Sequence, residues 1–463
     1  MRPVNLTARS ALDNLLKRNA LPSAKFLSDS LGVSLPTMHR ILASRNEDVV
    51  RLGTTKASRY ALKRPIRGEL KTLPIYQVNE QGKGIQCGFL ETVYPQGTIF
   101  HLDNAAWPRS AHANEYWDGL PYPMHDMRPQ GYLGRNFALR ASSDLNVSDN
   151  PDAWSDDDIT YVLSRRGSDT SGNLIIGDDA YRLWLEAVSS PEPSLREDEQ
   201  ATEYARMASE VTSLVGGGSS AGGEFPKFTT KRLLADRITP HVIVKFSGAD
   251  ASAPVQRWSD LLVCEHLALL SLSRHSKLST AFSRILSSSG RTFLEVERFD
   301  RAGEYGRLPM LSLSSLDAAF IGMGKADWPV IADRLLKLGF ISAPVQREIE
   351  MLWWFGKLIG NTDMHLGNLS FTFDWNAQQL ESLALSPVYD MLPMMYSPLS
   401  GGEIPERRYL PQLPLPREAD SWNDAYQVAK EFWRIASVDE RISSSFRAIC
   451  LENFKSINRL GYS

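Results

Sequence analysis

A short stretch, residues 360–368, combines the residue types and the spacing that phosphoryl-transfer chemistry needs. It contains Asp363, His365 and Asn368, so that an Asp is followed five residues later by an Asn, with a His between them. In a phosphotransferase catalytic loop the Asp orients the attacking hydroxyl and accepts its proton, while the Asn holds a Mg²⁺ that neutralises the γ-phosphate. We therefore expect Asp363 and His365 to be catalytic and Asn368 to bind metal, with an ordinary polar turn as the alternative.

Apolar segments on both sides should hold this stretch in place. The run at 351–359, which includes Trp353 and Trp354, predicts a buried helix before it, and residues 369–373 predict a strand after it. Polar residues held between two buried elements are more often a site than a solvated loop. Further along the chain, Asp390 follows an apolar strand end, where we expect a second metal-binding carboxylate.

A glycine-rich run lies upstream, at residues 216–223, and has five glycines in eight residues. Glycines let backbone N–H groups approach a polyphosphate closely, because no Cβ stands in the way. The run is not followed by the Gly-Lys-Ser/Thr of a Walker A loop, and a flexible linker is the alternative. The sequence at 224–227 and the strand pattern beyond it favour a structured, phosphate-binding loop.

Lys245 lies within an apolar strand pattern at residues 241–246. A buried ammonium is unfavourable without an anionic partner. ATP phosphates would supply that partner, and so would Glu265 from the next predicted helix. After a further predicted strand, Glu297 and Phe299 are placed to contact an adenine through the backbone and the ring.

The first 65 residues differ in charge from the rest of the chain. They hold twelve Lys/Arg and four Asp/Glu, which gives +8 within a chain whose net charge is −3. The remainder therefore carries −11. A basic module on an acidic body indicates a polyanion partner for the module alone, and duplex DNA is the partner we expect.

The pattern within this module is three helices followed by two short strands, at residues 8–19, 24–31, 35–43, 49–52 and 58–62. This order resembles the winged helix-turn-helix of bacterial transcription regulators, whose third helix enters the major groove. The residues expected to contact bases or phosphates are Ser34, Thr37, His39 and Arg40 in the third helix and Arg51, Lys56 and Arg59 in the wing. A small basic domain that docks on the rest of the chain is the alternative.

Other classes of protein are disfavoured by composition. The cysteines, Cys87, Cys264 and Cys450, are far apart, which argues against a disulfide framework and fits a reducing cytoplasm. The histidines of the middle region, His101, His112 and His125, lack metal-ligand spacing, so we expect ordinary histidines there. The chain has no run of 18 apolar residues and no apolar signal core, and we expect no membrane association.

Five pieces of residues 216–393 occur in the order found in the HipA family of serine/threonine kinases, the toxin components of bacterial toxin–antitoxin modules. They are residues 220–227, 244–246, 297–301, 360–368 and 387–390. The chain therefore resembles this family, and its fused N-terminal module resembles the YjjJ-type branch. The usual partner in the family, a separate helix-turn-helix antitoxin, is a possible partner here as well.

The resemblance implies an α+β multidomain chain with a bilobal, protein-kinase-like (HipA-like) fold and an N-terminal winged helix-turn-helix. The expected domains are 1–65 for DNA binding, 66–190 as a HipA-like N-terminal subdomain, 200–305 as a kinase N-lobe with the Gly-rich loop, and 306–463 as a helical C-lobe with the catalytic loop.

The resemblance also implies ATP and Mg²⁺ as cofactors and gives each candidate residue a role. Lys245 would bind the α- and β-phosphates and Asp363 would be the base. Asn368 and Asp390 would bind Mg²⁺. The other nucleotide-contact residues would be Ser220, Gly222, Gly223, Lys227, Glu297 and Phe299. Ser220 matches the serine that such kinases autophosphorylate, which ejects the loop and switches the enzyme off, with Ser219 as the neighbouring alternative.

Three functions follow as hypotheses. The first is an ATP-dependent protein serine/threonine kinase that acts as a toxin, phosphorylates a protein substrate on Ser or Thr, and carries its own DNA-binding domain. The second is a DNA-bound transcriptional regulator that uses a kinase fold to sense nucleotide. The third is a toxin that cleaves DNA with metal held by Asp363 and Asp390.

Overall fold

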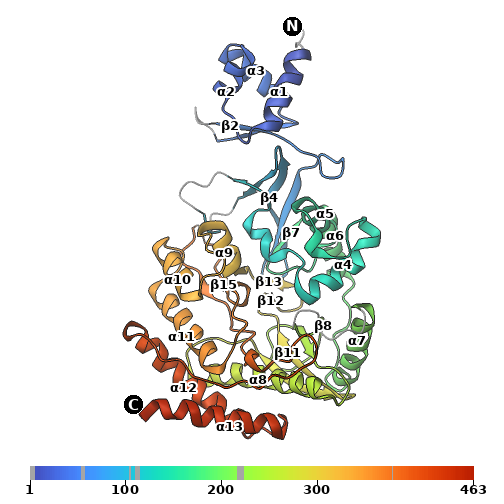
Figure 1. The fold of residues 1–463 in the computed structure, drawn as a ribbon. Coiled ribbons are helices and arrows are strands. Elements are labelled where there is room, and N and C mark those ends of the chain that lie inside the picture. Colours follow the sequence, from blue (N-terminus) through green and yellow to red (C-terminus); the bar gives the residue numbers. More distant parts are fainter. Residues whose placement is uncertain are drawn as a thin grey trace.

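The structure is a computed structural model that describes residues 6–53, 58–103, 106–109, 115–215, 224–377 and 379–462. It mixes helices and sheets, and the N-terminal helices lie at the opposite end of the molecule from the last two C-terminal helices (Figure 1). Among the described residues, no helix is long and apolar enough to cross a membrane.

The N-terminal region folds as three helices and a β-hairpin, in the predicted order. Its elements are α1 (Leu6–Arg18), α2 (Ala24–Leu31), α3 (Leu35–Ala43), β1 (Val49–Leu52) and β2 (Arg59–Leu62). The Ser23 and Ser34 side chains cap α2 and α3 by accepting backbone N–H bonds. Gly32, in the left-handed region at φ 63°, ends α2 and turns the chain toward α3. Nine buried residues form a core within this region.

The middle region is built on a five-stranded antiparallel sheet in the order β6-β5-β4-β3-β7. The strands are β3 (Leu73–Val78), β4 (Gly84–Val93), β5 (Gly97–Leu102), β6 (Tyr116–Trp117) and β7 (Leu174–Ile176), with α4 (Gly131–Leu145), α5 (Asp156–Arg166) and α6 (Asp178–Ser189) around them. The acidic residues at 156–158 form the first turn of α5, behind a capping box of Ser155 and Asp158. Leu52 and Ala61 of the N-terminal hairpin pack on Val93 and Ile99 of this sheet.

A second sheet, in the order β10-β11-β9-β8, follows the middle region. Its strands are β8 (Lys227–Lys231), β9 (His241–Phe246), β10 (Ser283–Ser288) and β11 (Arg291–Glu297). Alternate residues point to opposite faces of a strand. Val242, Val244 and Phe246 therefore pack toward α7 (Gln200–Val215), whereas Lys245 lies on the other face, which α8 (Ala253–His275) covers.

The C-terminal region is mostly helical. Its elements are β12 (Arg301–Ala302), β13 (Gly306–Arg307), β14 (Leu311–Ser312), α9 (Leu313–Phe320), α10 (Trp328–Lys337), α11 (Ala343–Ile359), β15 (Ser370–Thr372), β16 (Ala384–Leu385), α12 (Ala419–Ala436) and α13 (Ser444–Asn458). Helix α12 packs against α8, α11 and α13. It thereby joins the last helices to the second sheet.

Helix α11 confirms the predicted helix before the catalytic-loop candidate but not the burial of its tryptophans. Leu352, Phe355 and Ile359 are buried and share one helical face. Trp353 and Trp354 are only half-buried, so the prediction that both are buried was wrong. The physical reason is the helical period: residues 353 and 354 lie between Leu352 and Phe355 in sequence and therefore project away from the buried face that those two residues share.

Candidate active site

The centre of the candidate site is an ion-pair cluster formed by Lys245, Glu265 and Asp390. The Lys245 ammonium donates to both oxygens of Glu265, at 2.6 and 2.8 Å, and also to Asp390. Strand β9 presents the lysine and the facing helix α8 presents the glutamate, which has no exposed surface. From the sequence, either ATP phosphates or Glu265 could be the anionic partner of Lys245. In the structure Glu265 is a partner of the lysine.

Charge competition sets the protonation of this cluster. Burial opposes charge on the lysine, but Asp390 and Glu265 outweigh it and raise the pKa of Lys245, which stays an ammonium. Burial also works against an ionised Asp390, yet the lysine lowers the pKa of that carboxyl. Burial raises the pKa of Glu265 to about 7. Lys245 opposes this shift, and the nearby negative charge of Asp390 adds to it.

The catalytic-loop candidate begins where α11 ends, at Gly360, whose φ of 75° is in the left-handed region. Asn361 then joins two parts of the site: its Nδ2 donates to the Asp390 carbonyl at 3.3 Å, and its Oδ1 accepts the Asp363 N–H at 3.0 Å. Asn368 closes the loop, because its Nδ2 donates to the Asp363 carbonyl at 2.8 Å. The loop is therefore held by its own amide side chains.

The two catalytic candidates on this loop differ in what their side chains contact. Asp363 is exposed, so a substrate hydroxyl can reach its carboxylate. His365 is exposed as well, but its Nδ1 accepts the Gly367 N–H at 3.1 Å and so stabilises the turn. The carbonyl of His365 accepts the indole N–H of Trp328 at 3.2 Å, which ties the loop to α10.

Tyr389 is a residue that the sequence analysis did not single out. Its hydroxyl donates to the Gly367 carbonyl at 2.8 Å and lies 2.6 Å from Ser370 Oγ, while its ring stacks on Phe299 with centroids 5.4 Å apart. The next residue, Asp390, has a φ of 55°, which an Asp adopts more readily than most side chains. The sequence did offer a sign of its importance, because Tyr389 directly precedes Asp390, the predicted metal-binding carboxylate.

The predicted adenine-contact residues are differently placed. The Glu297 carboxylate binds Arg232 Nη2 at 3.0 Å and Arg237 Nε at 2.9 Å, so its side chain is used within the protein. Its backbone N–H donates to the Phe282 carbonyl at 2.9 Å, so the predicted adenine contact can use neither the carboxylate nor this N–H without breaking a bond. Phe299 is half-buried and lies next to the cluster through its stack on Tyr389.

Lys227 lies directly opposite Lys245 in the β8–β9 pair, so both side chains point to the same face. Its ammonium pairs with Glu224 at 2.8 Å. The other residues predicted for the phosphate loop, Ser220, Gly222 and Gly223, lie outside the described residues, as does the alternative Ser219.

The ligand atoms available at the cluster are oxygens. Because Asn368 turns its NH₂ group to the loop, its amide oxygen is the end left for a cation, and Asp390 supplies a carboxylate. Mg²⁺ prefers such oxygen ligands and is usually held by few protein groups. Among the described residues, no group of three or more His, Cys, Asp or Glu could hold a metal ion.

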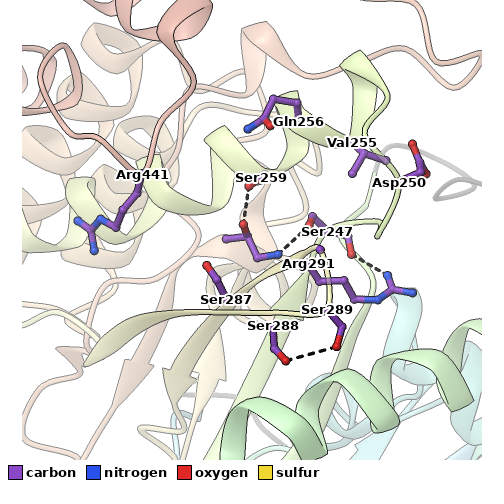
Figure 2. A pocket seen from close by; sticks show the side chains of 12 residues that line it. Ser247, Asp250, Val255, Gln256, Ser259, Ser287, Ser288, Ser289, Arg291 and Arg441 are labelled. Atoms are coloured by element: carbon purple, nitrogen blue, oxygen red, sulfur yellow. Dashed lines mark hydrogen bonds between the residues drawn. The ribbon is translucent and has the colours of Figure 1, made fainter.

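A separate cavity of about 490 Å³ lies at the far end of the second sheet (Figure 2). Ser247, Gln256, Ser259, Arg291 and Arg441 are among its lining residues, and its walls carry hydroxyls and guanidiniums. None of the predicted site residues that the structure describes lines it. The ion-pair cluster, and not this cavity, is therefore the candidate active site.

The candidate DNA-contact residues of α3 lie at the surface. Ser34, His39 and Arg40 are exposed and Thr37 is half-buried. Arg40 Nη2 donates to Thr37 Oγ1 at 3.4 Å, and Ser34 Oγ caps the helix. One turn of α3 thus presents hydroxyls and a guanidinium together.

The wing residues are split by strand alternation. In the β1–β2 register Arg51 is opposite Tyr60, whereas Arg59 is opposite Leu52. The two exposed arginines therefore lie on opposite faces of the hairpin, and Arg59 shares the face of Leu52 that packs on the middle sheet. The third predicted wing residue, Lys56, lies outside the described residues.

Comparison with known proteins places these observations in a family. Residues 69–185 match the model of the YjjJ-like toxin middle domain, and residues 219–452 match that of the HipA-like C-terminal domain. Over 440 residues the chain is 36% identical to a protein named Toxin YjjJ from Escherichia coli (strain K12), and the match covers 95% of each chain.

Two solved structures are similar at low identity. One is a HipA from Shewanella oneidensis MR-1, solved with HipB and operator DNA, with a TM-score of 0.48, 15% identity, and coverage of 84% of this chain and 97% of that one. The other is the proinflammatory kinase CtkA from Helicobacter pylori, with a TM-score of 0.35, 12% identity, and coverage of 52% and 90%.

Proposed function

Because the chain belongs to the family of YjjJ-like toxins and carries a HipA-like C-terminal domain, we propose that it is an ATP-dependent protein serine/threonine kinase that acts as a toxin. The observation that carries the proposal is that hydrogen bonds and an ion pair link three predicted site residues, Asp363, Asp390 and Lys245. Asn361 joins Asp363, the proposed base, to Asp390, and Asp390 pairs with Lys245.

The residues of the cluster fit Mg²⁺-ATP as the cofactor. Asp390 and the amide oxygen of Asn368 would hold the metal, and Lys245 would bind phosphate oxygens. When bound, Mg²⁺-ATP supplies the transferable phosphoryl group and the charge that offsets its negative oxygens. Glu265 contacts the lysine through both oxygens and so fixes the direction of its ammonium.

The proposed base, Asp363, is ready to receive a protein hydroxyl. Its side chain is exposed, while its own N–H and C=O are held by Asn361 and Asn368. A Ser or Thr hydroxyl of the substrate would donate its proton to this carboxylate as its oxygen bonds to the γ-phosphorus of ATP. The bond from that phosphorus to the bridging oxygen would break, and ADP would leave with the bridging oxygen. Fixed backbone bonds on both sides keep the carboxylate in position without blocking it.

Phosphate transfer from γ-³²P-ATP, measured beside Mg²⁺-dependent plasmid nicking, tests the proposal against its alternatives. We expect the full-length chain to label a protein Ser or Thr and to leave the plasmid intact, and folded Asp363→Ala to transfer no label. A folded wild-type chain that nicks the plasmid without labelling protein would be a nuclease. One that binds ATP and DNA but does neither would be a nucleotide-sensing regulator.

The Gly-rich loop is the proposed site of regulation. Phosphorylation of Ser220 would add about two negative charges beside the ATP phosphates that Lys245 must neutralise. Like-charge repulsion would then expel the loop and block nucleotide binding. Phosphopeptide mapping after incubation with Mg²⁺-ATP tests this. Label on neither Ser219 nor Ser220, or normal ATP binding by Ser220→Asp, would contradict it.

The N-terminal region is the proposed DNA-binding module, a winged helix-turn-helix with α3 as the recognition helix. Its net charge of +8 over residues 1–65 and the exposed Arg40 on α3 support this. Gel-shift titrations of the full-length chain at several salt concentrations test it. We expect steep loss of affinity with salt, and no shift at low salt would remove the proposal.

A further inference from the structure

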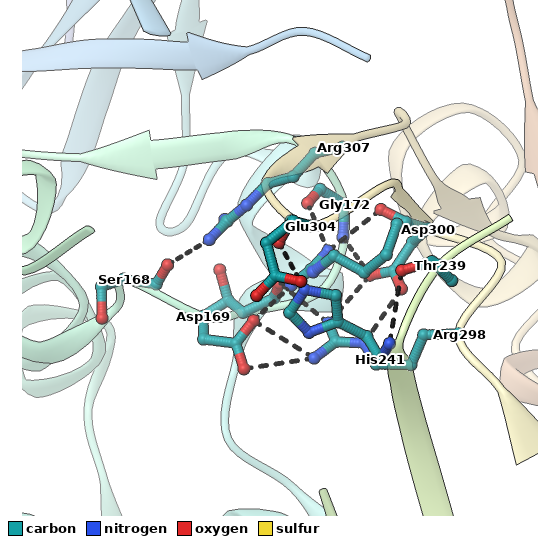
Figure 3. Close-up of polar contacts among 11 residues, drawn as sticks. Ser168, Asp169, Gly172, Thr239, His241, Arg298, Asp300, Glu304 and Arg307 are labelled. Carbon is teal, nitrogen blue, oxygen red and sulfur yellow. Dashed lines mark hydrogen bonds and ion pairs between the residues drawn. The ribbon is translucent and has the colours of Figure 1, made fainter. Parts of the chain in front are cut away.

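A loop of the middle region, residues 168–172, is tied to the segment that follows β11 (Figure 3). Asp169 binds Arg298 Nη1 through both oxygens at 3.2 Å and Arg301 Nη2 at 2.6 Å. The Thr170 carbonyl accepts from Arg301 Nη2 at 2.7 Å, and the Gly172 N–H donates to Asp300 at 3.0 Å. The two segments therefore form one hydrogen-bonded unit, although they are far apart in sequence.

The charges in this unit make Asp169 hard to replace. Arg298, Arg301 and Arg307 are all buried, and the carboxylates near them are those of Asp300 and Asp169. The Asp169 side chain is 55% exposed, but its carboxylate faces the guanidiniums of Arg298, Arg301 and Arg307. These outweigh the desolvation of the carboxylate and hold its pKa far below its ordinary value. Without the Asp169 carboxylate, the three buried guanidiniums would have Asp300 as their nearby carboxylate, and their mutual repulsion would distort the segment at residues 297–301 to which two of them belong.

The segment held in this way contains the proposed adenine contacts. Residues 297–301 run from Glu297 through Phe299 to Arg301, and Phe299 stacks on Tyr389 beside Asp390. Movement of the segment would therefore move the nucleotide-facing backbone and the ring together. We propose that Asp169, from the middle region, is a positioning residue that fixes this segment for nucleotide binding. The inference rests on the proposed kinase function and adds the middle domain to its nucleotide site.

Two measurements on full-length Asp169→Asn test the inference. The first is hydrogen exchange without nucleotide, which we expect to become faster at the amides of Arg298 and Arg301 while the core of the middle sheet stays protected. The second is the steady-state kinetics of phosphoryl transfer, in which KM for ATP should rise about tenfold with little change in kcat. Asp169→Glu, which restores a carboxylate, should recover most of the affinity.

Asp144→Asn is the matched control, because it neutralises an exposed middle-region carboxylate that pairs with Arg166. It should leave exchange and KM unchanged. Unchanged exchange and KM in folded Asp169→Asn would overturn the inference, as would a fall in kcat alone. If wild type does not transfer phosphate, the proposed function fails, and local exchange in Asp169→Asn alone then decides whether the loop fixes the segment. If Asp169→Asn is too unstable to purify, Asp169→Glu takes its place in the exchange experiment. Normal protection of the Arg298 and Arg301 amides then supports the role of the carboxylate, and faster exchange contradicts it.

Discussion

The N-terminal region and the candidate active site hold their polar residues in opposite ways. In α3, His39 and Arg40 are exposed, and the core beneath them is apolar. Around the active site, polar groups are buried and paired: Glu265 has no exposed surface and accepts from Lys245 at 2.6 and 2.8 Å, and Lys245 is 7% exposed. Polar side chains that the solvent surrounds can be changed without altering the fold, whereas buried ones are both structural and functional.

This difference predicts which substitutions change one property and which change two. A surface residue of α3 should affect binding alone. A buried member of the cluster should affect activity and stability together, since removing one partner leaves an uncompensated charge. Asp363 is the instructive exception, because it belongs to the active site but its carboxylate is exposed.

The largest effect is expected from Asp363→Asn. Loss of the proposed base should lower phosphoryl transfer about a thousandfold or more. Since the side chain is exposed, the melting temperature should stay within a degree or two of wild type. Radiolabel transfer and thermal unfolding of the same sample measure both. A variant of normal stability that retains most of its activity would contradict the role of Asp363.

Lys245→Met should reduce both activity and stability. It leaves the carboxylates of Glu265 and Asp390 facing each other in a buried place, which costs about 3 kcal/mol of unfolding free energy. Denaturant unfolding measures this loss, and adding Glu265→Gln should restore part of it. Lys337→Met, which breaks an exposed pair with Asp333, is the control and should change stability by less than about 0.5 kcal/mol. Equal effects of Lys245→Met and Lys337→Met would refute the contrast between buried and exposed pairs.

A smaller effect is expected from acid on His241. Burial, together with Arg301, lowers the pKa of His241 to about 4, so the ring is neutral in the folded chain. An unfolded histidine binds its proton near pH 6.5. The stability from this group is therefore present above pH 6.5 and is lost as the pH falls toward 4, by about 2 kcal/mol at pH 5. His241→Gln should flatten this part of the stability–pH curve in denaturant titrations, and an unchanged slope would contradict it.

The smallest effect is expected from Arg40→Ala in the proposed DNA-binding module. Losing one phosphate contact should weaken duplex binding about tenfold at low salt and make the salt dependence shallower by about one unit of slope. Stability should change by less than about 0.5 kcal/mol, because the side chain is exposed. Lys455→Ala in α13 removes an equal charge elsewhere and should bind normally. Equal loss in both variants would indicate nonspecific attraction.

Local features of the sequence predicted much of the fold. Ser23 and Ser34 fixed the starts of α2 and α3, and the apolar pattern around Lys245 matched β9 residue for residue. Capping and periodicity act over one or two turns, so they can be recognised in a single sequence. Alternation along one strand is equally local. The register between two strands depends on how they pack, however, so the sequence did not reveal that Arg51 and Arg59 lie on opposite faces of the hairpin.

The sequence by itself determined the chemistry of the candidate site: an Asp and an Asn five residues apart in a loop between apolar segments, a lysine in a buried strand, and a lone carboxylate beyond. Only the tertiary structure decided which of these groups meet. Lys245 pairs with Glu265 across 20 residues and with Asp390 across 145, and Asp169 reaches Arg301 across 132. Such partners are chosen when the chain packs, because a buried charge must find an opposite charge among whatever elements the core brings together, and no local propensity encodes that choice.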